Sequence, residues 1–234
     1  MTITGTDLTK VNPMPAVLCD FDDTTAMENV AELLLNRFGD GEWLALREEH
    51  RKGIITLKCY QELTFAAIKV DRETMKSLVK EKATLRPYFK ELWSFCQRKQ
   101  IPLGIVSHGL DFYIEALLEK ENLAQIPVFA VHTDYTDQGI TYEYPYAWDR
   151  CEWEAGNCKC ATLRRYKDNG HTILYAGDGK SDYCPASKEA DYVFARSSLV
   201  KQCEKGNIPF KEFESFSTVL DALKLMMNRP VGEC

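Results

Sequence analysis

The sequence lacks the features that would direct it to a membrane or to nucleic acid. No uninterrupted apolar stretch approaches the roughly 20 residues that a membrane-spanning helix needs. Basic residues are in the minority, 29 against 35 acidic residues, and the formal charge of -6 argues against general electrostatic binding to nucleic acid or to an anionic membrane. We therefore expect no nucleic-acid partner and no membrane partner.

Leader and disulfide signals are missing as well. Residues 1–11 lack the basic and apolar regions of a signal peptide, and the nine cysteines lack the spacing of a disulfide framework. These absences favour a cytoplasmic location with reduced thiols. The 234 residues suffice for one large core, or for a core domain with a smaller insert, and we expect a monomer or a homodimer.

What the sequence does contain is a pair of carboxylates directly after a short apolar run. The run, Ala16–Cys19, has the length of a buried parallel strand, and Asp20 and Asp22 follow it. Side chains alternate along an extended chain, so both carboxylates are expected on one side while Phe21 points into the protein. Such a pair resists desolvation unless a cation or a proton relieves it. An Asp-rich turn bonded to nearby amides is the alternative.

The remaining pattern predicts an α/β fold, with a doubly wound and mostly parallel sheet. Helical spacing dominates from Glu28 to about Ala83, which indicates a helical cap inserted after the first strand. The predicted division is a core of residues 1–26 and 85–234 and a cap of residues 27–84. An extra helical layer without a role in the site is the alternative.

Two later segments place polar residues where predicted strands end. Ser107, with His108 and Gly109, follows the apolar run Leu103–Val106 and precedes a helix that begins near Asp111. A hydroxyl and backbone amides at such a junction suit a phosphate oxygen, although a serine that simply caps the helix would look the same.

The second of these segments follows the strand Thr172–Ala176. Its glycines permit a tight turn, and Asp178 and Asp182 offer the hard oxygen ligands that magnesium prefers. A Gly-Asp-Gly sequence taken alone is ordinary turn chemistry.

Other residues have plain interpretations beside functional ones. Cys151, Cys158, Cys160 and Cys184 could surround zinc, but their spacing departs from the usual pattern. The tyrosines at 142, 144 and 146, with Trp148 and Trp153, could line a substrate entrance or form one side of a hairpin strand. The charged residues Arg47, Glu48 and Glu49 are expected on a solvated helix face.

Four of these segments, taken in order, resemble the motifs of the haloacid-dehalogenase superfamily of phosphotransferases. They are Asp20–Thr24, Ser107–Gly109, Lys159 and Gly177–Asp182. The helical block after the first motif is similar to the cap of the branch that contains phosphoserine phosphatase. Within that branch, short sequence segments such as Asn157–Lys159 and Asp111–Tyr113 look most like those of the methionine-salvage phosphatases. These enzymes act on 2-hydroxy-3-keto-5-methylthiopentenyl-1-phosphate.

The chain departs from the phosphoserine phosphatase pattern at two places. Asn29 stands where a cap-facing glutamate is usual, with Glu28 one position earlier, and the cap arginine has no evident counterpart between Leu57 and Ile68. Both departures weaken recognition of an amino-acid substrate. Glu28–Asn29 also resembles the phosphoethanolamine and phosphocholine phosphatases.

The resemblance implies a magnesium-dependent hydrolysis of a small phosphorylated metabolite. Asp20 would be the nucleophile that forms an aspartyl-phosphate, and Asp22 the general acid and base. Asp20, Asp22 through its backbone carbonyl, and Asp178 would hold Mg²⁺, with Asp182 in support. The remaining site residues that the resemblance implies bind substrate: Ser107, His108, Gly109, Lys159 and Glu28.

Three functional classes stay open from the sequence. The leading one is a phosphomonoesterase of the methionine-salvage type, with phosphoserine, phosphoethanolamine and phosphocholine as alternative substrates. A phosphotransferase could use the same aspartyl-phosphate. A non-catalytic protein on this scaffold is disfavoured, because the carboxylates, the serine and the lysine of the motifs are all present.

Overall fold

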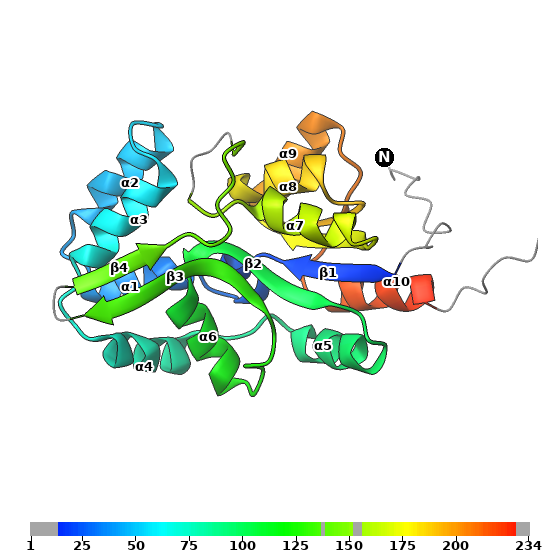
Figure 1. The fold of residues 1–234 in the computed structure, drawn as a ribbon, viewed down its shortest axis with the longest axis horizontal. Helices are drawn as coiled ribbons and strands as arrows, with labels where there is room; N and C mark the ends of the chain where they lie inside the picture. Colours follow the sequence, from blue (N-terminus) through cyan, green and yellow to red (C-terminus); the bar gives the residue numbers. More distant parts are fainter. Residues whose placement is uncertain (1–13, 137–138, 152–155, 228–234) are drawn as a thin grey trace, which may run out of the picture. The chain divides into compact units, whose positions relative to one another are not determined.

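The structure is a computed structural model, and it describes residues 14–136, 139–151 and 156–227 (Figure 1). It has the expected α/β fold, with seven strands in the order β4-β3-β2-β1-β5-β6-β7. The pairs β1 with β5, β2 with β3, β5 with β6 and β6 with β7 are parallel, whereas β3 and β4 are antiparallel. The predicted mostly parallel sheet is therefore confirmed.

The strands follow the apolar runs of the sequence. Their bounds are β1 Pro15–Cys19, β2 Leu103–Leu110, β3 Val128–Thr136, β4 Gly139–Glu143, β5 Thr172–Gly177, β6 Tyr192–Ala195 and β7 Lys211–Glu212. Every residue of β1 and of β5 is buried, as expected for parallel strands covered on both faces.

The helices fall in two groups along the chain. Between β1 and β2 lie α1 Val30–Phe38, α2 Trp43–Arg51, α3 Leu57–Ala66, α4 Arg72–Lys82 and α5 Phe89–Arg98. The later helices are α6 Asp111–Lys120, α7 Lys159–Asp168, α8 Tyr183–Lys188, α9 Ser197–Gly206 and α10 Ser217–Met227. A turn at Phe21–Thr25, in which Asp22 and Asp23 have non-helical backbone angles, follows β1, and a short helical turn at Lys180–Asp182 follows β5.

The chain divides into two compact units. The first unit comprises the described residues within Met1–Asp20, Leu85–Gly104 and Leu163–Cys234. It contains β1, β5, β6 and β7, and Figure 1 shows α8 and α9 on one side of β1 and α5 with α10 on the other. Phe89 of α5 packs edge-on against Phe216, just before α10, with ring centroids 5.0 Å apart.

The second unit comprises Phe21–Thr84 and the described residues within Ile105–Thr162. It contains α1 to α4, most of β2, α6 and the hairpin of β3 and β4. Phe65 of α3 packs against Phe112 and Tyr113 of α6, with ring centroids 6.4 Å apart in each pair. These apolar contacts attach α3 of the helical segment to α6 of the same unit. The division into residues 1–26 and 85–234 as core and 27–84 as cap stays a prediction.

Local sequence signals mark some of the helix starts. Thr56 and Asp71 are N-caps whose side chains accept hydrogen bonds from the N–H groups of Cys59 and Thr74. The hairpin predicted between Tyr135 and Ile140 is present as β3 and β4, although Asp137 and Gln138 of its turn lie outside the described residues. Among the described helices, none combines the length and the apolar character that crossing a membrane requires.

Candidate active site

Asp20 lies at the carboxyl end of β1, in the first unit. Its backbone N–H donates to the carbonyl of Ala176 over 2.9 Å, which continues the pairing of β1 with β5 by one residue. The side chain is 5% exposed. A carboxylate at the end of a central parallel strand is where α/β proteins place ligand-binding groups.

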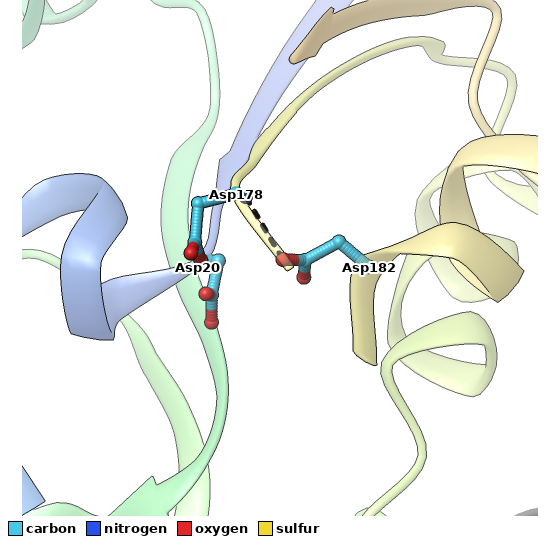
Figure 2. Close-up of side chains that lie close together, drawn as sticks. All are labelled: Asp20, Asp178 and Asp182. Atoms are coloured by element: carbon cyan, nitrogen blue, oxygen red, sulfur yellow. Dashed lines mark hydrogen bonds between the residues drawn. The ribbon is translucent and has the colours of Figure 1, made fainter. Parts of the chain in front are cut away.

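The turn after β5 brings Asp178 and Asp182 to the same place (Figure 2). Asp182 Oδ2 accepts from the N–H groups of Asp178 and Gly179, both over 3.0 Å, and its Oδ1 accepts from the Tyr175 hydroxyl over 2.6 Å. The fully buried Asp182 carboxylate therefore fixes the backbone that carries Asp178.

Gly177 permits this close approach. A Cβ added there would lie 2.6 Å from Cγ and 2.7 Å from Cβ of Asp182, closer than real Cβ atoms come to other atoms. The absence of a side chain at 177 is thus what allows Asp182 to fold back over the turn. The loop is held from its other side by Leu199 at the start of α9, whose N–H donates to the Asp178 carbonyl over 2.8 Å.

Asp20, Asp178 and Asp182 form a group that could hold a metal ion. One carboxylate oxygen from each lies within 4.8 Å of the others, and this is the only such group of three or more ligand residues among those that the structure describes. Carboxylate oxygens suit a hard divalent cation. Because Asp182 already accepts three hydrogen bonds, its place in this group fits a supporting role.

Asp22 lies in the second unit, in the turn that follows β1. Its Oδ1 accepts from the backbone N–H groups of Val30, over 2.7 Å, and Ala31, over 3.4 Å, at the start of α1. Its Oδ2 accepts from the hydroxyl of Tyr113, on α6, over 3.0 Å. Phe21 is fully buried, as the alternation after β1 predicts.

Burial raises the pKa of Asp22 to about 6, from an ordinary value of 3.8. The hydrogen bonds from Val30, Tyr113 and Ala31 act in the opposite direction, because they stabilise the charged form, and they offset only part of the desolvation. A carboxyl group with such a pKa can give up and take back a proton near neutral pH.

The Ser107 segment belongs to β2 and not to a loop after it. The strand continues to Leu110, one residue beyond the predicted end at Ser107–Gly109, with a change of register against β3 between Val106 and Leu110. The irregularity lets the chain stay extended while the ladder is interrupted. Buried Ser107 accepts from the Gly109 N–H through Oγ, over 2.9 Å, so it does not cap the next helix.

Lys159 is the first residue of α7 and is buried, with 3% exposure. The loop before it is fixed through Tyr146, whose N–H donates to Asn157 Oδ1 over 3.0 Å and whose carbonyl accepts from the Cys158 N–H over 2.8 Å. A buried ammonium group at a helix N-terminus gives the second unit a local positive charge.

Three of the four cysteines considered for zinc lie beside this lysine. Hydrogen bonding to Cys160, with contributions from backbone amides and Cys151, lowers the pKa of Cys158 to about 6. Cys151, Cys158, Cys160 and Cys184 do not form a set of three ligand atoms within 4.8 Å in the described part of the chain. Their geometry gives no support to zinc.

Glu28 makes contacts that the sequence does not indicate. Its two carboxylate oxygens accept from the N–H and the hydroxyl of Thr84, over 2.8 and 2.9 Å. Met27 N–H also donates to the Thr84 carbonyl over 2.9 Å. Glu28 thus joins the beginning and the end of the helical segment, and its role in substrate binding stays a prediction.

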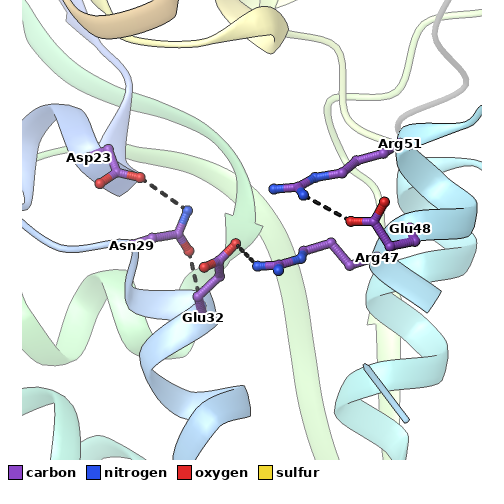
Figure 3. Close-up of polar contacts among 6 residues, drawn as sticks. All are labelled: Asp23, Asn29, Glu32, Arg47, Glu48 and Arg51. Atoms are coloured by element: carbon purple, nitrogen blue, oxygen red, sulfur yellow. Dashed lines mark hydrogen bonds and ion pairs between the residues drawn. The ribbon is translucent and has the colours of Figure 1, made fainter. Parts of the chain in front are cut away.

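Polar and charged residues at the start of α1 and on α2 make hydrogen bonds and ion pairs with one another (Figure 3). Asn29 caps α1 by accepting from the Glu32 N–H, and its amide donates to Asp23 over 3.2 Å. Arg47 pairs with Glu32 over 2.9 Å and its side chain is 25% exposed, so it is only partly solvated. Glu48 and Glu49 are exposed as expected.

The hairpin tyrosines attach β4 to the helical segment. Tyr144 donates to the carboxylate of Glu62, on α3, over 2.8 Å, and Tyr142 donates to its carbonyl over 3.4 Å. The alternation at 142 and 144 therefore reflects one side of a hairpin strand. Trp153 of the same aromatic set lies outside the described residues.

The sequence does not predict a role for two residues near the site. Tyr113 binds Asp22 across 91 positions of sequence, and Gln61 of α3 donates to the carbonyl of His108 over 2.7 Å. No local pattern could have found either contact. Tyr113 does lie within the segment Asp111–Tyr113, which contributes to the resemblance to the methionine-salvage phosphatases.

Solved structures of a haloacid-dehalogenase family hydrolase and of a phosphoserine phosphatase share this fold. The haloacid-dehalogenase family hydrolase, from Salmonella enterica serovar Typhi, matches with a TM-score of 0.69 and 19% identity. The match covers 92% of this chain and 74% of that one. A phosphoserine phosphatase solved as a phospho-aspartyl intermediate analogue matches with a TM-score of 0.65 and 19% identity, over 89% of this chain and 98% of that one.

The chain belongs to the family described as Putative Phosphatase, whose model matches residues 16–207. A relative from Brevibacillus brevis is 32% identical over 221 residues, which cover 92% of this chain and 97% of the relative. That relative is named 2-hydroxy-3-keto-5-methylthiopentenyl-1-phosphate phosphatase. A second, from Geobacillus kaustophilus, carries the same name and is 30% identical, over 90% of this chain and 96% of the relative. The sequence-based assignment to a phosphatase superfamily is confirmed.

Proposed function

We propose that this protein hydrolyses 2-hydroxy-3-keto-5-methylthiopentenyl-1-phosphate with the help of a divalent metal ion, Mg²⁺. The observation that carries the proposal is the cluster of Asp20, Asp178 and Asp182 at the carboxyl ends of two paired parallel strands. The substrate comes from the names of relatives that match over nearly the whole of both chains.

Asp20 is the proposed nucleophile. Its carboxylate attacks phosphorus, the bond from phosphorus to the ester oxygen breaks, and an aspartyl-phosphate forms. Water then attacks the phosphorus of this intermediate, which regenerates the Asp20 carboxylate and releases inorganic phosphate. The position of Asp20 at a strand end, held by the Ala176 carbonyl, supports this role because it limits the motion of the attacking group.

Asp22 is the proposed general acid and base. It gives a proton to the departing alcohol in the first step and takes one from the attacking water in the second. A pKa of about 6 supports both duties, because neither protonation state is strongly disfavoured near neutral pH. The hydrogen bond from the Tyr113 hydroxyl to Oδ2 orients the carboxyl group of Asp22.

Asp20, Asp178 and the backbone carbonyl of Asp22 are the proposed holders of Mg²⁺, with Asp182 in support. When bound, the ion reduces the repulsion between the carboxylate nucleophile and the phosphate dianion. The residues fit this ion, because all of them offer hard oxygen donors. Asp182 keeps Asp178 in place through two backbone hydrogen bonds even when no metal is bound.

Ser107 and Lys159 are the proposed ligands of the phosphoryl oxygens. Since Ser107 Oγ accepts from the Gly109 N–H, its own proton points elsewhere and can be donated to phosphate. Lys159 offers a buried positive charge, which stabilises the negative charge that spreads over the phosphoryl oxygens in the transition state. His108 and Gly109 are proposed to contribute their backbone to the same surface.

The proposal is tested by measuring phosphate release from a panel with and without Mg²⁺. The panel holds the methionine-salvage enol-phosphate, phosphoserine, phosphoethanolamine and phosphocholine, with added alcohols as alternative acceptors. We expect the enol-phosphate to give the highest kcat/KM and phosphate to pass to water. Asp20→Asn is expected to abolish turnover, whereas Glu49→Gln, an exposed change in α2, is expected to preserve it. Full activity of Asp20→Asn would disprove the mechanism, and preferred turnover of phosphoserine would disprove the substrate.

A further inference from the structure

Gln61 is a buried amide beside the Ser107 segment. It lies on α3 of the helical segment, its side chain is 7% exposed, and its Nε2 donates to the His108 carbonyl over 2.7 Å. Among the described residues, the neighbouring buried Thr64 of the helix binds carbonyls of its own helix, those of Tyr60 and Gln61. Gln61 is thus the polar group of α3 that reaches the predicted phosphate-binding strand.

The chemistry of an amide fixes which way Gln61 faces. A backbone carbonyl only accepts hydrogen bonds, so the amino group of Gln61 must lie against His108 and Oε1 must point the other way. Oε1 is shielded from solvent, and no donor among the described residues contacts it. Buried acceptors in folded proteins nearly always have a donor, so this oxygen requires an explanation.

The surroundings of Gln61 lead to the proposed acid. Its partner His108 precedes Gly109, and a Cβ added at Gly109 would overlap the Tyr113 hydroxyl and lie 3.2 Å from Asp22 Oδ2. The His108 carbonyl that Gln61 binds is therefore adjacent in sequence to Gly109, and Gly109 packs against Asp22. All of these residues belong to the second unit.

We propose that Gln61 is a specificity-determining residue that accepts a hydrogen bond from the substrate. The inference rests on the proposed function and deepens it. Asp22 protonates the ester oxygen, so the carbon chain of the leaving group begins beside Asp22. A donor next to that position must be a hydroxyl on the carbon adjacent to the phosphorylated one, because keto and thioether groups cannot donate. Phosphate esters of 1,2-hydroxylated alcohols and enols are the substrate class.

A purely structural role makes a different prediction. If Gln61 only fastens α3 to β2, its loss weakens turnover of every phosphate ester by the same factor. If Oε1 receives a substrate hydroxyl, a further loss falls on hydroxylated substrates alone. The ratio of two kcat/KM values separates these cases.

The experiment compares 1,2-propanediol 1-phosphate with n-propyl phosphate, two esters that differ only by the hydroxyl at carbon 2. The unaltered enzyme is expected to prefer the hydroxylated ester by about tenfold or more, because a site with a buried acceptor rejects an analogue that leaves it unpaired. In Gln61→Met the preference should fall to roughly onefold to twofold, and any loss from the missing bond to His108 should lower the turnover of both esters by the same factor. Thr64→Val, a buried change one helical turn away, should keep the preference.

Two results would overturn the inference. One is an unaltered enzyme that hydrolyses both esters with equal kcat/KM, a measurement that needs no variant and so does not depend on whether Gln61→Met folds. The other is a folded Gln61→Met protein with an unchanged ratio. An enzyme that hydrolyses neither ester nor any member of the panel would instead disprove the proposed function, and the inference with it.

Discussion

Asp22 should lower the stability of the folded protein at neutral pH, and its replacement by asparagine should raise it. The pKa of this group is about 6 in the folded state and 3.8 in an ordinary environment. The folded state therefore binds the proton more tightly than the unfolded state does. Stability from this group is fully present below pH 3.8 and is lost as the pH rises through about 6.

The size of the effect follows from the two pKa values. Their separation corresponds to about 3 kcal/mol, since one pKa unit is about 1.36 kcal/mol. Asp22 is only partly exposed, and its carboxylate keeps the bonds from Val30 and Tyr113. An asparagine is neutral at every pH, and its Oδ1 can still accept from α1. We expect Asp22→Asn to be about 1–3 kcal/mol more stable than the unaltered protein at pH 7, with the gain vanishing near pH 4.

The assay is urea unfolding of both proteins at several pH values between 4 and 7.5, in EDTA so that metal binding does not contribute. Asp71→Asn is the control with the opposite sign. The hydrogen bonds from Thr74 lower the pKa of Asp71, so its carboxylate favours the folded state as the pH rises. Activity of Asp22→Asn should fall by on the order of 10²–10⁴-fold.

A flat difference between Asp22→Asn and the unaltered protein across this pH range would refute the reasoning. It would mean that the Asp22 carboxylate is not desolvated in the folded protein, and a pKa near 6 would lose its physical cause. A difference that grows as the pH falls would have the wrong sign and would contradict it equally.

Three further predictions concern the neighbours of the two carboxylate sites. Gly177→Ala should displace Asp182, cost about 1–3 kcal/mol in urea unfolding and weaken Mg²⁺ binding measured by calorimetry, because the new Cβ would overlap a fully buried side chain; unchanged metal affinity would contradict this. Tyr113→Phe removes a bond that lowers the pKa of Asp22, so the pH profile of kcat should shift upward; a downward shift would contradict it. Asp178→Asn should raise the Mg²⁺ concentration needed for half-maximal activity by at least roughly tenfold, and an unchanged requirement would exclude Asp178 as a ligand.

The parts of the fold that the sequence predicts are those with strong local signals. The apolar runs at 16–19 and 172–176 are bounded by aspartate and glycine, and both are strands within a residue or two of the prediction. In contrast, β7 is two exposed polar residues, Lys211–Glu212, and carries no apolar pattern to find. The predicted end of β2 at residues 107–109 lies just before its observed end at Leu110, because these small polar residues fall where the ladder with β3 is interrupted and pairing returns at Leu110.

The candidate site divides in the same way. Asp20, Asp178 and Asp182 were found because each follows a strand, and parallel strand ends meet at one edge of a sheet. The contacts of Glu28 with Thr84 and of Asp22 with Tyr113 join residues 56 and 91 positions apart. Such pairs depend on how helices pack, and spacing along one chain holds no information about them.

The position of Asp22 links the proposed chemistry to the helical segment. Its Oδ1 is held by the first N–H groups of α1, so the helix that opens the segment stabilises the charged form of the acid. Loss of these bonds alone would raise the pKa of Asp22, whereas exposure of its carboxylate to water would lower it, and burial is the larger of the two influences. Glu28 and Thr84 lie at the two ends of the segment and limit motion that would draw α1 away. The pKa of the proposed general acid therefore depends on burial first and on the backbone that begins the helical segment second.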